Sequence, residues 1–216
     1  MKIQLTDILA IETTLKGQLY KATSPEAILS GQILAYENHL ITPVQCQKTS
    51  DQWQLLLHST KQLDASIITN IKGKGLHWQP DEAMLILSEG IGNYLCLHWL
   101  NGLRQQSEKS LSAQISRVLM HETEQFAFRP TPSKFLTPDL PGQMIAALPL
   151  LDDIGVVSRL CCDEFLPGAY EGSLVALFKN ETIKPQAWCG FVSEKTYSQL
   201  TVIIGEPTNW FNLDTL

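Results

Sequence analysis

The segment LILSEGIGNYL, residues 85–95, has the residue types and the spacing for binding the phosphates of a dinucleotide. An apolar run leads into Gly90 and Gly92, and a helical pattern follows. Glycines at such a turn let a phosphate approach the backbone, and the amino end of the helix attracts negative charge. Glu89 argues against this interpretation, because its carboxylate would repel a phosphate at close range. The alternative is a tight strand-to-helix turn that binds nothing, since one G-x-G is a weak signal.

A second candidate is LTVIIGEPTNWF, residues 200–211. Its β-branched run predicts a strand that ends at Gly205, with Pro207 two residues further on. Ligands of open α/β sheets bind at the carboxyl ends of the strands, so Gly205 and Pro207 are predicted to line a cofactor cleft. The alternative is a strand terminator near the chain end.

The remaining reactive residues are scattered. The five cysteines form no C-x-x-C pair and the five histidines form no H-x-x-x-H pair, so we predict no metal site. Scattered cysteines are typical of reduced, structural thiols in a cytoplasmic protein. No G-x-S-x-G elbow is present, and we assign no catalytic residue.

Composition excludes several classes of protein. The 216 residues are 44% hydrophobic and 18% charged, as in globular proteins with a sizeable core. The net charge is −6 and no basic cluster is present, which argues against nucleic acid as a partner. No apolar run reaches the roughly 20 residues that span a bilayer, and the first residues lack a signal-peptide core. We therefore expect neither a membrane nor a secreted location.

The chain separates into two predicted domains, residues 1–80 and residues 81–216. In the first, turns separate strand-like runs, which are typical of a small barrel or sandwich. These runs are KIQLTDILAIETTL (2–15), WQLLLHST (53–60) and ASIITNIKGKGLHW (65–78). Ser24–Pro25–Glu26 resembles a helix start, so a helix over residues 24–34 is the alternative there.

In the second domain, strand-like and helix-like runs alternate, which predicts an open parallel α/β sheet. The predicted strands are residues 83–90, 115–122, 156–162 and 200–207. The predicted helices are residues 91–106, 142–155 and 172–180, with Pro149 interrupting the second.

The stretch Phe126–Gly172 carries a resemblance to a known family. It contains FAFRPTPSKFL, then IAALPLLDDIGV, then SRL, then LPG and Glu-Gly. These segments resemble the nucleotide domain of dihydroorotate dehydrogenase electron transfer subunits, which belong to the ferredoxin reductase family. More loosely, SEGIGNYL takes the place of the family's glycine-rich nicotinamide loop, and IIGEPTNWF that of its C-G-x-x-x-M-like segment.

The resemblance implies an N-terminal flavin-binding β-barrel, followed by a parallel α/β domain that binds nicotinamide nucleotide. It implies FAD and NAD(P) as cofactors, with Gly90, Gly92, Gly205 and Pro207 as contacts. It also implies a dihydroorotate dehydrogenase-like catalytic subunit, or a second copy of the chain, as partner. We expect the replacement of Gly92 by valine to abolish nucleotide binding and to leave the fold intact.

The chain departs from the family at the residues that hold cofactors. The flavin-binding Arg-x-Tyr/Phe-Ser/Thr motif would lie near residues 40–46, where no arginine is present. Ser88 and Glu89 stand where the nicotinamide loop usually has glycines, and Ile204 stands where a cysteine is expected before Gly205. The chain stops at Leu216, before the cysteine-rich segment, so we expect no iron–sulfur cluster.

Two functions remain open from the sequence. The first is a degenerate electron-transfer subunit, a flavin- and NAD(P)-linked oxidoreductase component in pyrimidine biosynthesis. The second is a non-catalytic binding or regulatory relative that has lost its cofactors. Fold alone does not choose between them.

Overall fold

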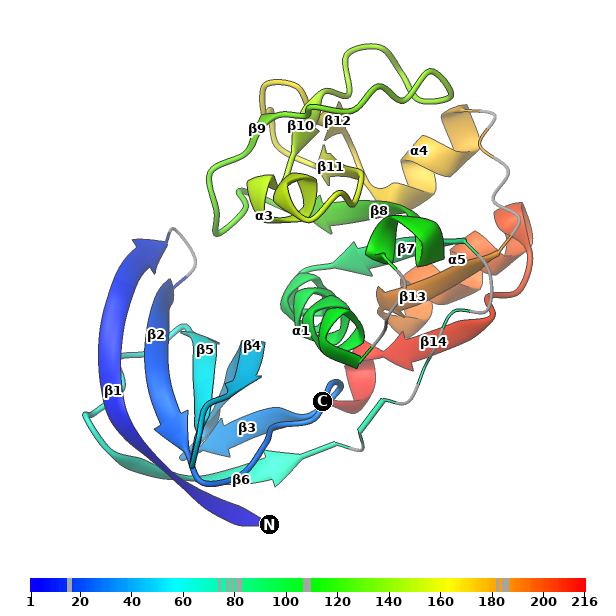
Figure 1. Cartoon of the computed structure of the whole chain (residues 1–216). Coiled ribbons are helices and arrows are strands. Elements are labelled where there is room, and N and C mark those ends of the chain that lie inside the picture. Colours follow the sequence, from blue (N-terminus) through cyan, green and yellow to red (C-terminus); the bar gives the residue numbers. More distant parts are fainter. Residues whose placement is uncertain are drawn as a thin grey trace. The chain divides into compact units, whose positions relative to one another are not determined.

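The chain forms two compact units in the computed structural model, which describes residues 1–14, 17–73, 75–76, 78, 80, 83–106, 110–181, 183 and 187–216 (Figure 1). One unit comprises Met1–His77, Tyr94–Gln106 and Leu216; the other comprises Trp78–Asn93 and Ser107–Thr215. The predicted domains, residues 1–80 and 81–216, remain a prediction.

The first unit contains a closed barrel of six antiparallel strands in the order β1-β2-β5-β4-β3-β6. The strands are β1 (Lys2–Thr14), β2 (Gly17–Ser24), β3 (Ile33–Tyr36), β4 (His39–Lys48), β5 (Trp53–Ser59) and β6 (Ile67–Lys72). Apolar side chains such as Leu5, Leu34 and Leu57 alternate into the barrel and are fully buried there. The strands predicted at 2–15, 53–60 and 65–78 are confirmed as β1, β5 and the shorter β6, and positions 15, 74 and 77 of these predictions lie outside the described residues.

Strand β4 is irregular where Pro43 interrupts it. The pairing with β5 shifts between Pro43 and Gln45, so Val44 is an extra residue opposite no partner. A proline cannot donate to the strand ladder, and a bulge accommodates it. The bulge sets the register in which Gln45 pairs with Leu56 on the barrel's outer side.

The second unit is a six-stranded sheet in the order β12-β11-β8-β7-β13-β14, in which every pair is parallel. The strands are β7 (Met84–Glu89), β8 (Ile115–Glu122), β11 (Ser158–Cys162), β12 (Tyr170–Glu171), β13 (Trp188–Val192) and β14 (Asn209–Asn212). The helices are α1 (Ile91–Gln106, which the two units share), α2 (Leu111–Gln114), α3 (Pro149–Asp153), α4 (Leu174–Asn180) and α5 (Glu194–Ile204). A short hairpin, β9 (Thr131–Pro132) with β10 (Ala146–Ala147), and a terminal 3-10 turn, η1 (Leu213–Thr215), complete the chain.

This architecture confirms the predicted β-barrel followed by a parallel α/β sheet. The strands predicted at 83–90, 115–122 and 156–162 and the helices at 91–106 and 172–180 are also confirmed. Among the described residues, no helix combines the length and the apolar character needed to cross a membrane.

The predicted strand at 200–207 is wrong, because residues 194–204 form helix α5. Ser193 caps this helix by accepting a hydrogen bond from the Thr196 backbone N–H, and Gly205 ends it with a φ of +84°. Leu200 is fully buried against the sheet, with Tyr197 and Ile204 packed beside it, at helical spacing. Packing on this face outweighs the strand preference of the β-branched run.

Two predicted helices are also corrected. Residues 25–32 are not helical: the Ser24 hydroxyl forms a local turn with the backbone of Glu26 instead of starting a helix. The helix predicted over 142–155 is only α3, because Ala146 and Ala147 pair as a strand with Thr131 and Pro132. Pro149 does not interrupt that helix but begins it, which suits its fixed φ and missing N–H.

A buried arginine holds the long loop before α3 in place. The guanidinium of Arg159, on β11, is 2% exposed and donates to the backbone oxygens of Phe135 and Ser158 and to the Thr137 hydroxyl. Asp152 accepts from the backbone N–H of Lys134 at 2.8 Å on the same loop. These bonds tie the loop to β11 and α3.

Replacing Arg159 with leucine should destabilise the second unit by about 2–4 kcal/mol, because it strips donors from buried carbonyls and leaves a cavity. The loop around Phe135 should then become sensitive to protease. Lys134→Met is the matched control: it breaks an exposed ion pair with Asp153 on the same loop and should leave the melting temperature nearly unchanged. Equal protease resistance in Arg159→Leu and the wild type would contradict this role.

The free energy of unfolding should depend on pH because of His98, which lies on α1. Burial lowers the pKa of His98 from 6.5 to about 4, against a smaller opposing effect of the Ile28 backbone. Between these two pH values the unfolded chain binds a proton that the folded chain does not, so stability falls as the pH is lowered. The loss should total roughly 3 kcal/mol by pH 4. Denaturant unfolding of wild type and His98→Gln at pH 7 and pH 4.5 tests this, and the variant should show the weaker pH dependence.

Candidate functional site

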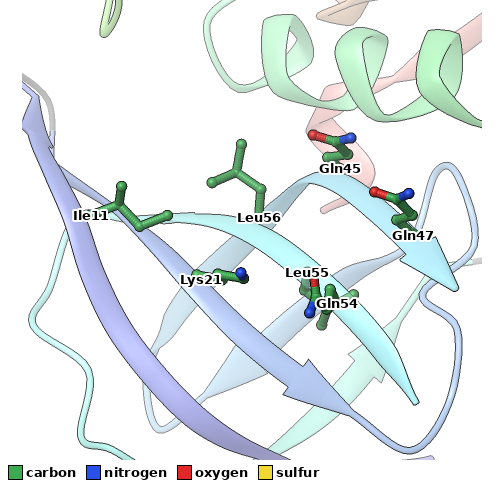
Figure 2. A pocket seen from close by; sticks show the side chains of 7 residues that line it. All are labelled: Ile11, Lys21, Gln45, Gln47, Gln54, Leu55 and Leu56. Carbon is green, nitrogen blue, oxygen red and sulfur yellow. The ribbon is translucent and has the colours of Figure 1, made fainter. Parts of the chain in front are cut away.

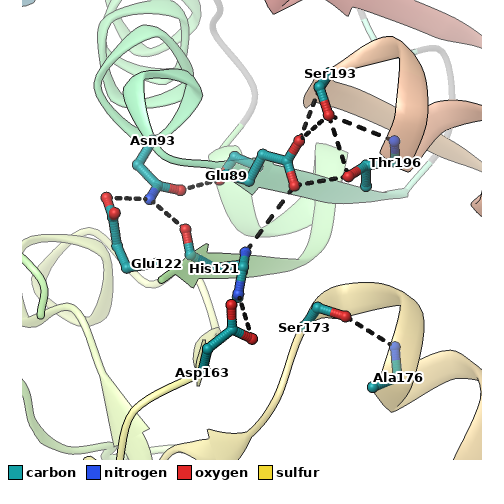
Figure 3. Close-up of polar contacts among 10 residues, drawn as sticks. Glu89, Asn93, His121, Glu122, Asp163, Ser173, Ala176, Ser193 and Thr196 are labelled. Carbon is teal, nitrogen blue, oxygen red and sulfur yellow. Dashed lines mark hydrogen bonds and ion pairs between the residues drawn. The ribbon is translucent and has the colours of Figure 1, made fainter. Parts of the chain in front are cut away.

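Polar side chains gather where the parallel strands of the second unit end. Glu89 ends β7, His121 lies at the end of β8, and Asp163 and Ser193 directly follow β11 and β13 (Figure 3). The chain proceeds outward in opposite directions from β7, through β8 on one side and β13 on the other, so the topological switch point lies between β7 and β13. Open α/β sheets bind their ligands at this point.

The carboxylate of Glu89 occupies the switch point. Its Oε1 accepts from the Ser193 backbone N–H at 2.8 Å and from the Ser193 hydroxyl at 2.6 Å. Its Oε2 accepts from the Thr196 hydroxyl at 2.9 Å. All three donors belong to the amino end of α5, where the helix dipole favours negative charge. The side chain is 18% exposed, so these are partly buried, charge-assisted bonds.

His121 lies between two carboxylates at the same edge. Its Nε2 is 3.2 Å from Oδ1 of Asp163, and its Nδ1 is 4.0 Å from Oε2 of Glu89 (Figure 3). The residue is 8% exposed. Any positive charge on this ring is thus faced by carboxylates on both sides, and it provides no free cation for a phosphate.

Asn93 braces the turn beneath these groups. It accepts from the Ser88 hydroxyl at 2.7 Å and donates to the His121 carbonyl at 2.9 Å and to Oε1 of Glu122 at 3.0 Å. Asn93 is 3% exposed, so the network is buried and rigid.

The structure places Gly90 and Gly92 at this edge, as predicted, but gives them structural tasks. Gly90 has a φ of +53°, and its N–H donates to the His121 carbonyl at 3.1 Å. A Cβ on Gly92 would lie 2.2 Å from the Phe191 carbonyl oxygen, so this glycine lets α1 begin close against β13. The expectation that Gly92→Val leaves the fold intact is therefore wrong. Their role as cofactor contacts stays a prediction.

Gly205 and Pro207 lie at the amino ends of the parallel strands, opposite to the carboxyl ends where the polar side chains gather. Gly205 accepts from the Trp188 indole N–H at 3.0 Å, and Thr208 donates to the Trp188 backbone oxygen at 2.8 Å. Trp188 is the first residue of β13, so these positions lie where parallel strands begin. The structure does not bring them together with Gly90 and Gly92.

Strand β13 also carries a Cys-Gly pair that the sequence interpretation missed. Cys189 and Gly190 lie directly beside β7 and lead toward Ser193. The loss of a cysteine at Ile204 therefore does not mean that the chain lacks such a pair. All five cysteines are buried, and burial raises the pKa of the Cys161 and Cys189 thiols. In the described part of the chain, no cluster of side chains could hold a metal ion.

The functional residues missed by the sequence interpretation share one signal. His121 is the next-to-last residue of β8, and Asp163 directly follows β11. Both strands were predicted correctly, and their carboxyl ends are where a parallel sheet binds its ligand. Ser193 could not be found this way, because strand β13 before it was not predicted.

The barrel carries a separate hollow of about 170 Å³ on its outer side (Figure 2). Lys21, Leu56 and Gln45 stand in one cross-strand row on β2, β5 and β4, and Gln54 pairs with Gln47 in a neighbouring row. Ile11 and Leu55 complete the lining. Gln45 falls within residues 40–46, the range in which the flavin motif is expected.

No known family model matches the chain, and no curated protein matches it. Solved structures share its fold. A cytochrome P450 reductase from Amycolatopsis matches with a TM-score of 0.65 and 11% identity, over 98% of this chain and 69% of that one. The ferredoxin reductase in carbazole 1,9a-dioxygenase matches with a TM-score of 0.60 and 9% identity, over 96% and 67%. The FAD/NAD binding domain of a Vibrio cholerae nitric oxide dioxygenase matches with a TM-score of 0.57 and 9% identity, over 97% and 98%.

These likenesses extend over nearly the whole chain, and the chain has the ferredoxin reductase-like fold. The predicted fold class is confirmed. At identities near one in ten the likeness concerns the fold alone, so cofactor and activity have to be argued from the residues of this chain.

Gly92→Ala should destabilise the protein by about 1–3 kcal/mol, because the new methyl group meets a backbone carbonyl that can move only with β13. Gly142→Ala is the control, since a Cβ at Gly142 meets nothing within 4 Å. Thermal unfolding of both variants measures the difference. Two equally stable variants would show that Gly92 has no packing role.

Proposed function

We propose that this chain is a degenerate electron-transfer subunit, similar in build to the flavin- and nicotinamide-binding component of dihydroorotate dehydrogenase. The hollow on the outer side of the barrel carries this proposal. Its lining includes Gln45 of β4, within residues 40–46 where the resemblance places the flavin motif, in a fold shared with an FAD/NAD binding domain.

The residues around the hollow fit the flat ring of a flavin better than its phosphates. Leu56 and Ile11 offer apolar contact to a ring face, and the amides of Gln45, Gln47 and Gln54 can hydrogen-bond its polar edge. Among the described residues that line the hollow, Lys21 is the one cation. The hollow is smaller than the roughly 300 Å³ at which ligand pockets begin, so it would hold the ring and leave the remainder of the molecule outside.

A flavin bound there would supply the redox chemistry, and the protein would bind and orient it. Lys21 would attract the negative charge of a reduced ring or of a phosphate. In this proposal the electrons are exchanged with a dihydroorotate dehydrogenase-like catalytic subunit.

Absorbance spectra of the purified protein, before and after incubation with FMN or FAD and gel filtration, test the proposal. We expect a retained flavin band and quenched flavin fluorescence on binding. Leu56→Glu should weaken flavin binding at least about tenfold, because it places a charge and a longer side chain in the middle of the hollow. Ile68→Glu is the matched control, since Ile68 is an exposed apolar residue of the same barrel that does not line the hollow.

Equal affinity in Leu56→Glu and Ile68→Glu would show that the flavin binds elsewhere. A folded wild type without flavin affinity would support the second candidate function, a non-catalytic binding relative. The position of the Glu89 carboxylate favours that candidate, because it fills the place where this class of sheet takes its ligand.

A further inference from the structure

Most donors at the amino end of α5 already have partners within the chain. Glu89 accepts from the Ser193 N–H, the Ser193 hydroxyl and the Thr196 hydroxyl. Oδ2 of Asp214 accepts from the Glu194 N–H at 2.8 Å, and the Ser193 hydroxyl oxygen accepts from the Thr196 N–H at 3.4 Å. The first N–H groups of a helix are the ones an external anion would use, and here four contacts to carboxylates already occupy this helix end.

The turn between β7 and α1 is occupied in a similar way. The Gly90 N–H donates to His121, and the Ser88 hydroxyl donates to Asn93. Gly92 has no room for an approaching group on its Cβ side, where the Phe191 carbonyl lies. The Gly90 N–H, which a dinucleotide phosphate could otherwise approach, therefore serves a contact within the protein.

The charges around the switch point have the wrong sign for a phosphate. Glu89 and Asp163 lie on the two sides of His121, and Asp214 and Glu194 lie at the start of α5. A phosphate placed about 4 Å from the Glu89 carboxylate would be repelled by it. Lys195, in the first turn of α5, is exposed, so solvent screens its charge.

From these contacts we infer that Glu89 is a built-in anion that takes the place of a dinucleotide phosphate at the switch point. The nicotinamide nucleotide that the fold implies does not fit this site. The sheet unit of this chain is thus closed to NAD(P)H, and the carboxylate that closes it also stabilises α5. This inference concerns the sheet unit alone and does not depend on the flavin proposed for the barrel.

The inference predicts that removing the Glu89 carboxylate creates an anion site that the wild type lacks. Inorganic pyrophosphate and NADH are the probes, with binding followed by calorimetry and by thermal unfolding. In the wild type neither probe should bind or raise the melting temperature. Glu89→Ala should melt at a lower temperature than the wild type and recover part of the loss on addition of pyrophosphate, with binding at least about tenfold tighter than in the wild type.

Two further variants make the result decisive. Glu89→Gln keeps the length of the side chain and one acceptor oxygen but loses the charge, so it should fold and gain affinity even if Glu89→Ala is unstable. Asp214→Asn removes a carboxylate from the same helix end without opening the switch point, so it should gain no pyrophosphate affinity. The inference is overturned if the wild type binds either probe as tightly as Glu89→Gln does. It is equally overturned if folded Glu89→Gln gains no affinity, or if Asp214→Asn gains as much.

Discussion

The hydrogen bonds between the Glu89 carboxylate and the amino end of α5 are the interaction on which the carboxyl end of the sheet depends. The carboxylate links the ends of two neighbouring strands, β7 and β13, through bonds to Ser193 and Thr196. A helix start needs acceptors for its free N–H groups, and it can obtain them from a ligand or from the chain. This chain provides its own, and the site becomes part of the structure rather than a place for a ligand.

The use of the chain's own groups in place of a ligand also explains why the turn after β7 contains glycines but no phosphate site. Gly92 is needed because α1 starts against the carbonyl of Phe191, whatever the turn binds. Gly90 adopts a positive φ that favours glycine and donates its N–H to His121. A glycine pattern indicates the backbone shape of a turn. Whether an anion can bind there depends on the neighbouring charge, which in this chain is the Glu89 carboxylate.

Strong local patterns made most of the fold predictable from the sequence. The buried strand at 84–89 and the helix at 91–106 have long, uninterrupted apolar patterns, and both were predicted correctly. The helix α5 was mistaken for a strand because Thr201, Val202, Ile203 and Ile204 favour strands locally, while its cap lies outside the apolar run. That error wrongly placed Gly205 at the carboxyl end of a strand and so at the predicted site. The strand whose carboxyl end lies there, β13, was not predicted.

The dense resemblance between Phe126 and Gly172 has a structural explanation that does not require a preserved activity. Arg159 binds the loop around Phe135 from inside, and a Cβ on Gly168, whose φ is +79°, would lie 2.9 Å from Ile145. Gly172 has a φ of +129°, and its N–H donates to Cys162 as the chain enters α4. Residues under such constraints tolerate few substitutions whatever the chain binds, because a change there disturbs the local backbone. The segment Phe126–Gly172 therefore supports a common fold with the reductases. The residues that decide what the chain binds lie at the switch point and on the outer side of the barrel.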